Sequence, residues 1–205
     1  MSEMNRITVG SIVEFGSWEQ CSGITARTPI DWLVLETDGQ TAVLISNRGL
    51  EFRAYHDEKG RINWDGCALR AWLNGPFLEE AFTAEEQARI RTVDLETRAY
   101  GEDDADIVIH TQDRVWLLSD DEAERYFAAD DERKCLPTER ALSYDAWFWN
   151  EVYGDGLECA WWLRSTGDSP DRAGVVLDYG MVVSDGWSAG REGPAVRPVI
   201  VLELA

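Results

Sequence analysis

The sequence is short of positive charge. Lys and Arg number 19 against 39 Asp and Glu in 205 residues, which gives a formal net charge of −20. Proteins bind phosphate backbones and anionic lipid surfaces mainly through basic side chains. We therefore expect no nucleic acid and no membrane among the partners. The acidic residues are interpreted as a well-solvated surface.

Signals for export, membrane insertion and local metal binding are also missing. Residues 1–6 lack the pattern of a signal peptide, and no later apolar run approaches the length of a transmembrane helix. The four cysteines, Cys21, Cys67, Cys135 and Cys159, form no C-x-x-C pair, so no zinc site built from local ligand pairs is expected. We predict a cytoplasmic protein with free thiols. The alternative is an exported protein with two disulfides, since the number of cysteines is even.

Catalytic motifs are scarce as well. The sequence contains no G-x-S-x-G elbow, no P-loop and no H-E-x-x-H. Its two histidines, His56 and His110, lie in charged segments and are interpreted as surface residues rather than bases. We therefore expect no catalytic residue, no metal and no cofactor.

Tryptophan, by contrast, is abundant. Ten tryptophans and an apolar content of 44% argue against disorder, and 205 residues suffice for one sizeable core. We predict a single domain over residues 1–205. The local patterns read as strands, then helices, then strands, which favours an α+β fold with small antiparallel sheets and two or three short helices.

Individual elements follow from local patterns. The predictions are a strand over 11–15 ended by Gly16; a hairpin of 30–36 and 41–46 around Asp38-Gly39; a helix over 63–76 capped by Asp65 and stopped by Gly75-Pro76; capping boxes at Thr83–Glu86 and Ser119–Glu122; a strand over 115–118; a loop or exposed hairpin over 101–113; and a partly covered Trp147-Phe148-Trp149.

Two apolar segments near the C-terminus each carry an arginine. Trp161 and Trp162 would point to opposite faces of a strand, so both faces need cover, which predicts a central strand. The segment 196–202 is interpreted as the neighbouring strand. Arg164 and Arg197 lie among apolar residues, and we expect each to pair with an internal carboxylate. The alternative is that they present a fork to an anionic ligand.

The ordered set Trp32-Leu33-Val34-Leu35, Leu69-Arg70-Ala71-Trp72-Leu73-Asn74, Val115-Trp116-Leu117-Leu118-Ser119, Trp161-Trp162-Leu163-Arg164-Ser165 and Val196-Arg197-Pro198 resembles a bacterial family known as domain of unknown function DUF6273. The resemblance runs from about residue 30 onward. It carries no activity with it.

The last third also resembles the C-type-lectin-like fold shared by formylglycine-generating enzymes and retroelement-diversified phage receptor proteins. That resemblance implies a small antiparallel sheet carrying a loop region that binds ligands. The calcium signatures Glu-Pro-Asn and Trp-Asn-Asp are absent, which argues against calcium-dependent sugar binding. Formylglycine-generating enzymes use two cysteines late in the fold, and the only late cysteine here is Cys159, interpreted as a small core residue.

Between the two arginine-bearing segments lies a stretch, 165–195, that is dense in Gly, Asp and Ser. We predict a loop-rich, ligand-facing insert, because rigid strands on either side would hold such loops in place. Its candidate binding residues are Asp178, Tyr179, Asp185, Trp187 and Arg191. Trp187 admits two readings, an exposed contact residue or a plug over the core.

These observations favour a non-catalytic binding or scaffold module for a protein or small-molecule ligand. The alternatives are an enzyme related to formylglycine-generating proteins, and an adhesion or phage-receptor-like module.

Overall fold

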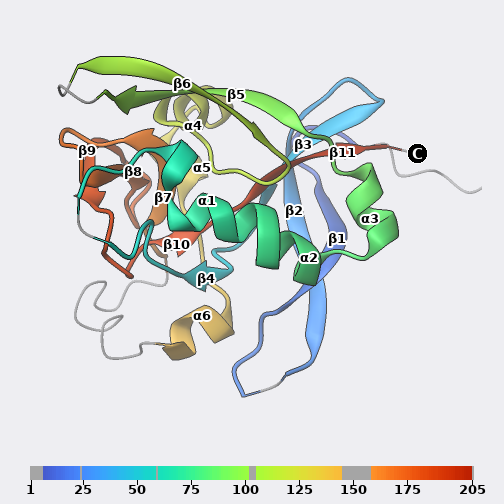
Figure 1. Ribbon diagram of the computed structural model, residues 1–205. Coiled ribbons are helices and arrows are strands. Elements are labelled where there is room, and N and C mark those ends of the chain that lie inside the picture. The colour runs from blue at the N-terminus through green and yellow to red at the C-terminus, as the bar shows by residue number, and fades with distance from the viewer. Residues whose placement is uncertain (1–6, 24, 59, 102–104, 145–157, 205) are drawn as a thin grey trace, which may run out of the picture.

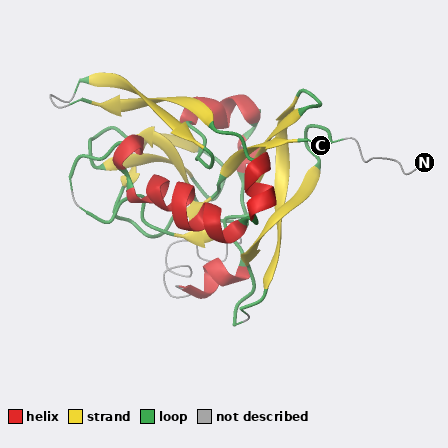
Figure 2. Ribbon diagram, turned by 45° about the vertical axis from the view of Figure 1, so that its right-hand side comes forward, coloured by secondary structure: helices red, strands yellow, loops and turns green. Residues whose placement is uncertain are grey.

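The computed structural model describes residues 7–23, 25–58, 60–101, 105–144 and 158–204. Within them, the chain forms a four-stranded sheet, a five-stranded sheet and a two-stranded hairpin, with short helices between them (Figures 1 and 2). This mixed arrangement confirms the α+β class. The strands are β1 (Ile12–Glu19), β2 (Arg27–Thr37), β3 (Thr41–Ser46), β4 (Glu51–Phe52), β5 (Val93–Tyr100), β6 (Asp106–Asp113), β7 (Trp161–Thr166), β8 (Arg172–Val176), β9 (Val182–Ser188), β10 (Ala195–Val196) and β11 (Val199–Glu203). The helical segments are η1 (Trp64–Gly66), α1 (Ala68–Trp72), η2 (Leu73–Phe77), α2 (Leu78–Ala81), α3 (Ala84–Arg89), α4 (Asp120–Tyr126), α5 (Asp130–Arg133) and α6 (Glu139–Tyr144).

The four-stranded sheet has the order β1-β2-β3-β11 and is antiparallel throughout. The predicted hairpin of β2 and β3 is confirmed. Asp38 Oδ1 accepts hydrogen bonds from the backbone N–H groups of Gln40 and Thr41, at 2.8 and 2.6 Å, and Gly39 adopts a φ of +84°. An aspartate that bonds to its own turn, followed by a glycine with positive φ, is a common hairpin solution.

The prediction that Gly16 ends the first strand was wrong. β1 continues to Glu19, with a bulge between Glu14 and Ser17. Gly16 has a φ of +65°, and a Cβ there would lie 2.5 Å from the ring of Phe82. The glycine therefore lets the strand bend closely over that ring instead of terminating it.

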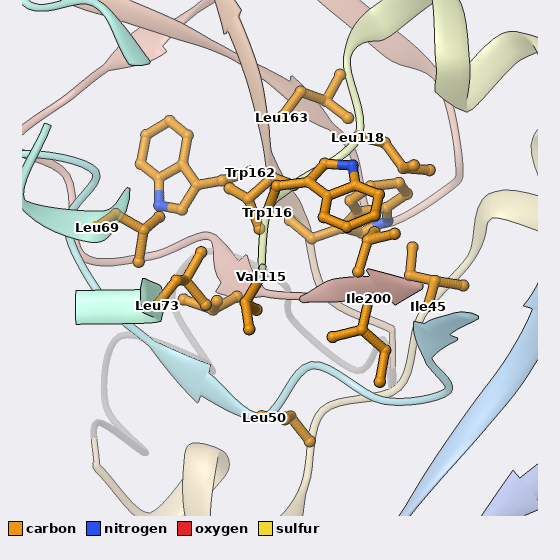
Figure 3. Packing of buried hydrophobic residues seen from close by; sticks show 14 of the residues in the cluster. Ile45, Leu50, Leu69, Leu73, Val115, Trp116, Leu118, Trp162, Leu163 and Ile200 are labelled. Atoms are coloured by element: carbon orange, nitrogen blue, oxygen red, sulfur yellow. The ribbon is translucent and has the colours of Figure 1, made fainter. Parts of the chain in front are cut away.

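The five-stranded sheet has the order β4-β10-β7-β8-β9, so the Trp-Trp strand is central, as predicted. All six residues of β7 are buried. The indole N–H of Trp161 donates to the carbonyl of Arg133 at 3.1 Å, and that of Trp162 donates to the carbonyl of Arg53 at 2.8 Å. Each tryptophan thus satisfies its polar atom within the interior. Figure 3 shows Trp162 among other buried residues of the core, such as Leu69 and Trp116.

The segment 196–202 is the neighbour of β7 only in part. Its first two residues form β10, where Ala195 pairs in parallel with Trp161. Its remainder forms β11, which pairs with β3 in the other sheet. Arg197-Pro198 stands between the two strands, and Pro198 has no N–H to offer a ladder, so the chain leaves one sheet there and enters the other.

The helix predicted over 63–76 begins and ends at other residues in the structure. Asp65 lies within η1, and the cap of α1 is Cys67, whose Sγ accepts from the N–H of Arg70 at 3.3 Å. Gly75-Pro76 does not stop the run. Pro76 lies in the wider π-helical turn η2, and α2 follows directly to Ala81. A widened turn accommodates a residue that lacks an N–H and would clash with the preceding turn of an α-helix.

Both predicted capping boxes are present, at Thr83–Glu86 before α3 and Ser119–Glu122 before α4. The apolar run 115–118 is buried but is no strand; it makes a single bridge between Trp116 and Val199. The loop or exposed hairpin expected over 101–113 is confirmed in part: β6 lies within that range, but its partner β5 precedes it, and the pair crosses the top of Figure 1. The tryptophan-rich segment 147–149 lies outside the described residues.

The stretch 165–195 contains the hairpin that its apolar runs 175–177 and 181–183 predict around a turn at 178–180, but the strands are longer than expected, so the stretch is less loop-rich than predicted. It contains β8 and β9, which pair as a hairpin and extend the five-stranded sheet. Val175, Val176 and Ala173 are fully buried there. The stretch is rich in glycine because other segments of the chain pass close to it. A Cβ on Gly180, for example, would lie 1.8 Å from the backbone oxygen of Asp130. The glycines therefore serve close packing of strands and turns rather than long loops.

Candidate functional site

The five predicted binding residues fall into two groups on the β8–β9 hairpin. Asp178 and Tyr179 lie in its turn, where Tyr179 is exposed. Trp187 lies near the far end of β9, and Arg191 follows that strand. Five residues of strand separate Val182 from Trp187, about 17 Å at the usual rise. Asp185 is an exposed β9 residue whose backbone carbonyl accepts from the N–H of Asp168 at 2.9 Å.

Trp187 and Arg191 meet. The Arg191 guanidinium lies 4.1 Å from the centre of the Trp187 ring, a cation–π contact. Trp187 is half-buried and packs against the core, so it is neither a fully exposed contact nor a sealed plug. Arg191 also lines a cavity of about 550 Å³ together with Asp57, Asp171 and Ser188.

Arg164 has the structural setting that was predicted. Its guanidinium is 3% exposed and forms a bidentate pair with the Glu122 carboxylate. It also donates to the carbonyl of Leu117 at 2.9 Å and to Thr97 Oγ1 at 3.0 Å. The contact with Thr97 links the β5–β6 hairpin to the five-stranded sheet. Glu122 is itself the last residue of the Ser119 capping box, so one carboxylate serves the helix and the arginine.

For Arg197 the predicted carboxylate is missing. Among the described residues, no Asp or Glu pairs with this guanidinium, which is 2% exposed. Its Nε donates to the carbonyl of Ser46 at 2.9 Å, and its charge lies 5.1 and 5.5 Å from the ring centres of Trp161 and Phe127. The aromatic faces thus take the place that we assigned to an anion.

A cleft that the sequence analysis missed lies beside β4, and we call it the β4 cleft. In Figures 1 and 2, α6 lies below β4 and the run from α1 to α2 above it. The cleft has two adjoining parts, of about 340 and 180 Å³, that share Glu51, Arg53 and Arg140. Its other lining residues are Trp18, Glu19, Arg27, Phe52, Ala54, Asp57, Trp72, Glu80, Ala141 and Glu192.

One wall of the β4 cleft consists of tryptophan covered by arginine. Trp18 and Trp72 meet edge to face, with ring centres 6.0 Å apart. The Arg53 guanidinium lies 4.5 Å from the centre of Trp72, and that of Arg27 lies 5.8 Å from Trp18. Phe77 packs beneath both tryptophans, at 5.0 and 5.1 Å, and connects this wall to the core.

The opposite wall is held in place by backbone bonds. The N–H of Arg140 in α6 donates to the carbonyl of Gln20 at 3.0 Å, and the Arg140 side chain pairs with Glu19. Thr138 Oγ1, just before α6, donates to the carbonyl of Leu50 at 3.1 Å. The start of α6 is therefore tied to both β1 and the residue before β4, which keeps the cleft from collapsing.

Polar groups in the β4 cleft are incompletely matched. Glu51 and Arg53 are 3.8 Å apart, which is an ion pair without a hydrogen bond, and the Glu51 side chain is 22% exposed. Burial raises the pKa of Glu51, although Arg53 and Arg140 act in the other direction. Among the described residues, Trp18 Nε1 and Arg53 Nε are buried donors without an acceptor. Unsatisfied buried groups are uncommon in native proteins and call for a specific explanation.

No local pattern would have revealed this cleft. Its residues come from seven separate stretches of the chain and share no spacing, and Glu51-Phe52-Arg53 resembles any short surface strand. The contacts of its arginines are also distant in the sequence, since Arg27 pairs with Glu80 and Arg140 with Glu19.

The histidines and cysteines lie outside this cleft. His110 is an exposed residue of β6, as expected, whereas His56 is half-buried, and its Nδ1 accepts from the N–H of Ala68 at the start of α1. All four cysteines are free thiols. Among the described residues, no group of three or more His, Cys, Asp or Glu could hold a metal ion, and no helix is long and apolar enough to cross a membrane.

Two cysteines far apart in the sequence meet inside the protein. The backbone N–H of Cys159 donates to the carbonyl of Cys135 at 2.8 Å, and its thiol approaches the same oxygen at 3.4 Å. Hydrogen bonding from the Cys159 thiol, aided by the Arg197 charge, lowers the pKa of Cys135 to about 7. Burial raises the pKa of Cys67 to about 12. The pair 135 and 159 escaped the sequence analysis because it has no local spacing.

Comparison with known families places the chain. The model of the family DUF6273, a domain of unknown function, matches residues 38–204. The chain belongs to this family. The match begins in the β2–β3 turn and includes every lining residue of the β4 cleft except Trp18, Glu19 and Arg27. No curated protein and no solved structure matches the chain.

Proposed function

We propose that this DUF6273 protein is a non-catalytic binding module and that its ligand site is the β4 cleft. The observation that carries the proposal is the unmatched polar chemistry of a preformed cleft: one loosely paired carboxylate, Glu51, and two buried donors without acceptors, on Trp18 and Arg53. Concave sites of a few hundred Å³ with a small number of convergent polar groups are the usual form of small-molecule sites. The Glu51 and Arg53 side chains are 22% and 41% exposed, so a ligand in the cleft can reach both.

The earlier candidate surface around Trp187 and Arg191 adjoins this site. Asp57 lines both the β4 cleft and the cavity beside Arg191. We therefore treat Arg191, with Trp187 behind it, as the outer end of the same binding surface. Asp178 and Tyr179, at the other end of β9, stay outside this proposal.

A C-type-lectin-like core is part of the proposal. What supports it is that β1 and β11 belong to one sheet, and that β7, β8, β9 and β10 of the second sheet lie in the last third of the chain, where the sequence resembles that fold. In this view the β4 cleft lies between the two sheets and the helices α1, α2 and α6.

An enzyme related to formylglycine-generating proteins is the second candidate. The observation in its favour is that Cys159 meets Cys135 in the fold. However, the two residues are 0% and 2% exposed, so a substrate could not reach either sulfur in this conformation. An adhesion or phage-receptor-like role rests on the fold resemblance alone.

A thermal-shift screen tests the binding function. The library contains amino acids, short peptides, monosaccharides, small carboxylates and amines, and it is applied to wild type and to Arg53→Met. We expect at least one compound to raise the melting temperature of wild type but not of the variant, because a ligand that binds only the native state stabilises it by mass action. The control is Arg98→Met, which alters an exposed arginine of β5 far from the cleft.

Two results would contradict the proposal. One is that no compound stabilises the wild type. The other is that every stabilising compound acts equally on wild type and Arg53→Met, which would place the binding surface elsewhere.

A further inference from the structure

The charges of the β4 cleft divide into matched and unmatched groups. Arg140 pairs with Glu19, and Arg27 pairs with Glu80 at 3.2 Å while also donating to its backbone carbonyl. The pair of Glu51 and Arg53 is the loose one, at 3.8 Å, and the Arg53 guanidinium lies against the Trp72 ring instead. The unmatched chemistry of the cleft is therefore concentrated on these two residues and on Trp18.

The unmatched groups are of opposite kinds. Glu51 has carboxylate oxygens that accept no hydrogen bond from any described residue, so it needs a donor, and a cationic donor suits it best. Arg53 Nε lacks an acceptor among the described residues, and the Arg53 side chain is 41% exposed, so a ligand can reach its guanidinium. Trp18 Nε1 also lacks an acceptor there, but it is buried beneath that surface. An acceptor with negative charge would suit the guanidinium. A ligand that carries both a cationic donor and an anionic acceptor would therefore match the polar groups of the cleft.

We propose that the ligand is a zwitterion, an amino acid or short peptide whose ammonium group binds Glu51 and whose carboxylate binds Arg53 beside Trp18. This inference rests on the proposed binding function of the β4 cleft. The cleft's main part, about 340 Å³, is near the lower end of the usual range for small-molecule sites and suits a ligand of this size.

The same charges disfavour other classes of ligand. A nucleotide or another polyanion would meet Glu51, Asp57 and Glu192 along the cleft. Only Arg53 could receive its several charges, since Arg27 and Arg140 are paired with Glu80 and Glu19. A neutral sugar would leave the charges of Glu51 and Arg53 uncompensated, and both tryptophan faces that it could stack upon are covered by arginine. A simple amine would satisfy Glu51 alone.

Titration calorimetry with four probes tests the ligand class: alanylalanine, its N-acetyl form, its C-terminal amide, and methyl glucoside. We expect the free dipeptide to bind and each blocked form to bind at least about tenfold more weakly, because each loses one charged contact. In Glu51→Gln the free and acetylated forms should bind alike. In Arg53→Met the free and amidated forms should bind alike. Glu124→Gln, which alters an exposed residue of α4, serves as the matched control and should bind as wild type does.

The outcomes separate the ligand class from the binding function. Equal binding of blocked and free dipeptide, or binding of methyl glucoside in place of the dipeptide, would overturn the zwitterion. If the library screen still finds a compound that depends on Arg53, the cleft remains a binding site with a different ligand. Absence of dipeptide binding to wild type up to millimolar concentration would also overturn the zwitterion.

Discussion

Replacing Arg164 with methionine should destabilise the protein more than any other single arginine change. The guanidinium is 3% exposed and holds four groups: both oxygens of Glu122, the carbonyl of Leu117, Thr97 Oγ1 and the carbonyl of Glu96 at 3.3 Å. Methionine fills a similar volume but donates no hydrogen bond. The Glu122 charge is then left in a largely apolar setting.

The expected size of the effect follows from the burial of the partner. Removing one member of a buried ion pair costs about 3–5 kcal/mol. The Glu122 side chain is 24% exposed, so water can replace part of what it loses, and the lower end, about 3 kcal/mol, applies. For a protein of this length, this corresponds to a melting temperature lower by roughly 6–12 °C.

Urea unfolding followed by tryptophan fluorescence measures this loss. The double variant Arg164→Met/Glu122→Gln should recover part of it, because the stranded charge is gone while the amide oxygen can still accept the bond from Ser119. Arg98→Met is the control: its pair with Asp106 is exposed on both sides and should cost less than about 1 kcal/mol. Equal stability of Arg164→Met and Arg98→Met would refute the reasoning.

Four further predictions concern other residues. Arg197→Met should lower the free energy of unfolding by only about 1 kcal/mol, because it leaves one carbonyl, and no carboxylate among the described residues, without its partner. A loss as large as that of Arg164→Met in the same urea assay would contradict this. Glu51→Gln should gain stability relative to wild type as pH rises. Burial raises the pKa of Glu51, so between the ordinary carboxyl pKa and the raised one only wild type must ionise a buried group. A difference in unfolding free energy that does not change with pH would contradict this. Trp187→Ala should cost about 2 kcal/mol, below the range for a fully buried tryptophan, as judged by thermal unfolding, with a loss above about 3 kcal/mol indicating a plug. Thiolate absorbance should increase near pH 7 in wild type but not in Cys135→Ser, and Cys67 should ionise only at far higher pH. Identical titrations of the two proteins would contradict the lowered pKa of Cys135.

Features that depend on neighbouring residues in the chain were predicted well. The Asp38-Gly39 turn and the two capping boxes are closed by bonds over two or three residues, so the sequence contains all of their partners. The central position of β7 also followed from local chemistry, since adjacent tryptophans require cover on both faces.

Features that depend on distant partners were predicted less well. Gly16 was interpreted as a strand end because nothing in the sequence shows that the strand passes closely over Phe82. Arg197 was assigned a carboxylate because nothing in the sequence places the rings of Trp161 and Phe127 around it. The β4 cleft combines segments from the first strand to the last strand pair, and its chemistry arises only from that assembly.

The passage of the chain from β10 to β11 has a consequence for synthesis. Residues 195–203 contribute a strand to each of the two large sheets, and their partners β3, β4 and β7 are all made earlier. Neither sheet can be completed while this segment is still inside the ribosome. A nascent chain would expose the edge of β3, with Leu44 and Ile45 beside it, and open strand edges invite pairing with other chains. Until residues 195–203 are available, this edge is therefore a place where newly made copies can associate, a liability that the stability of the folded protein would not reveal.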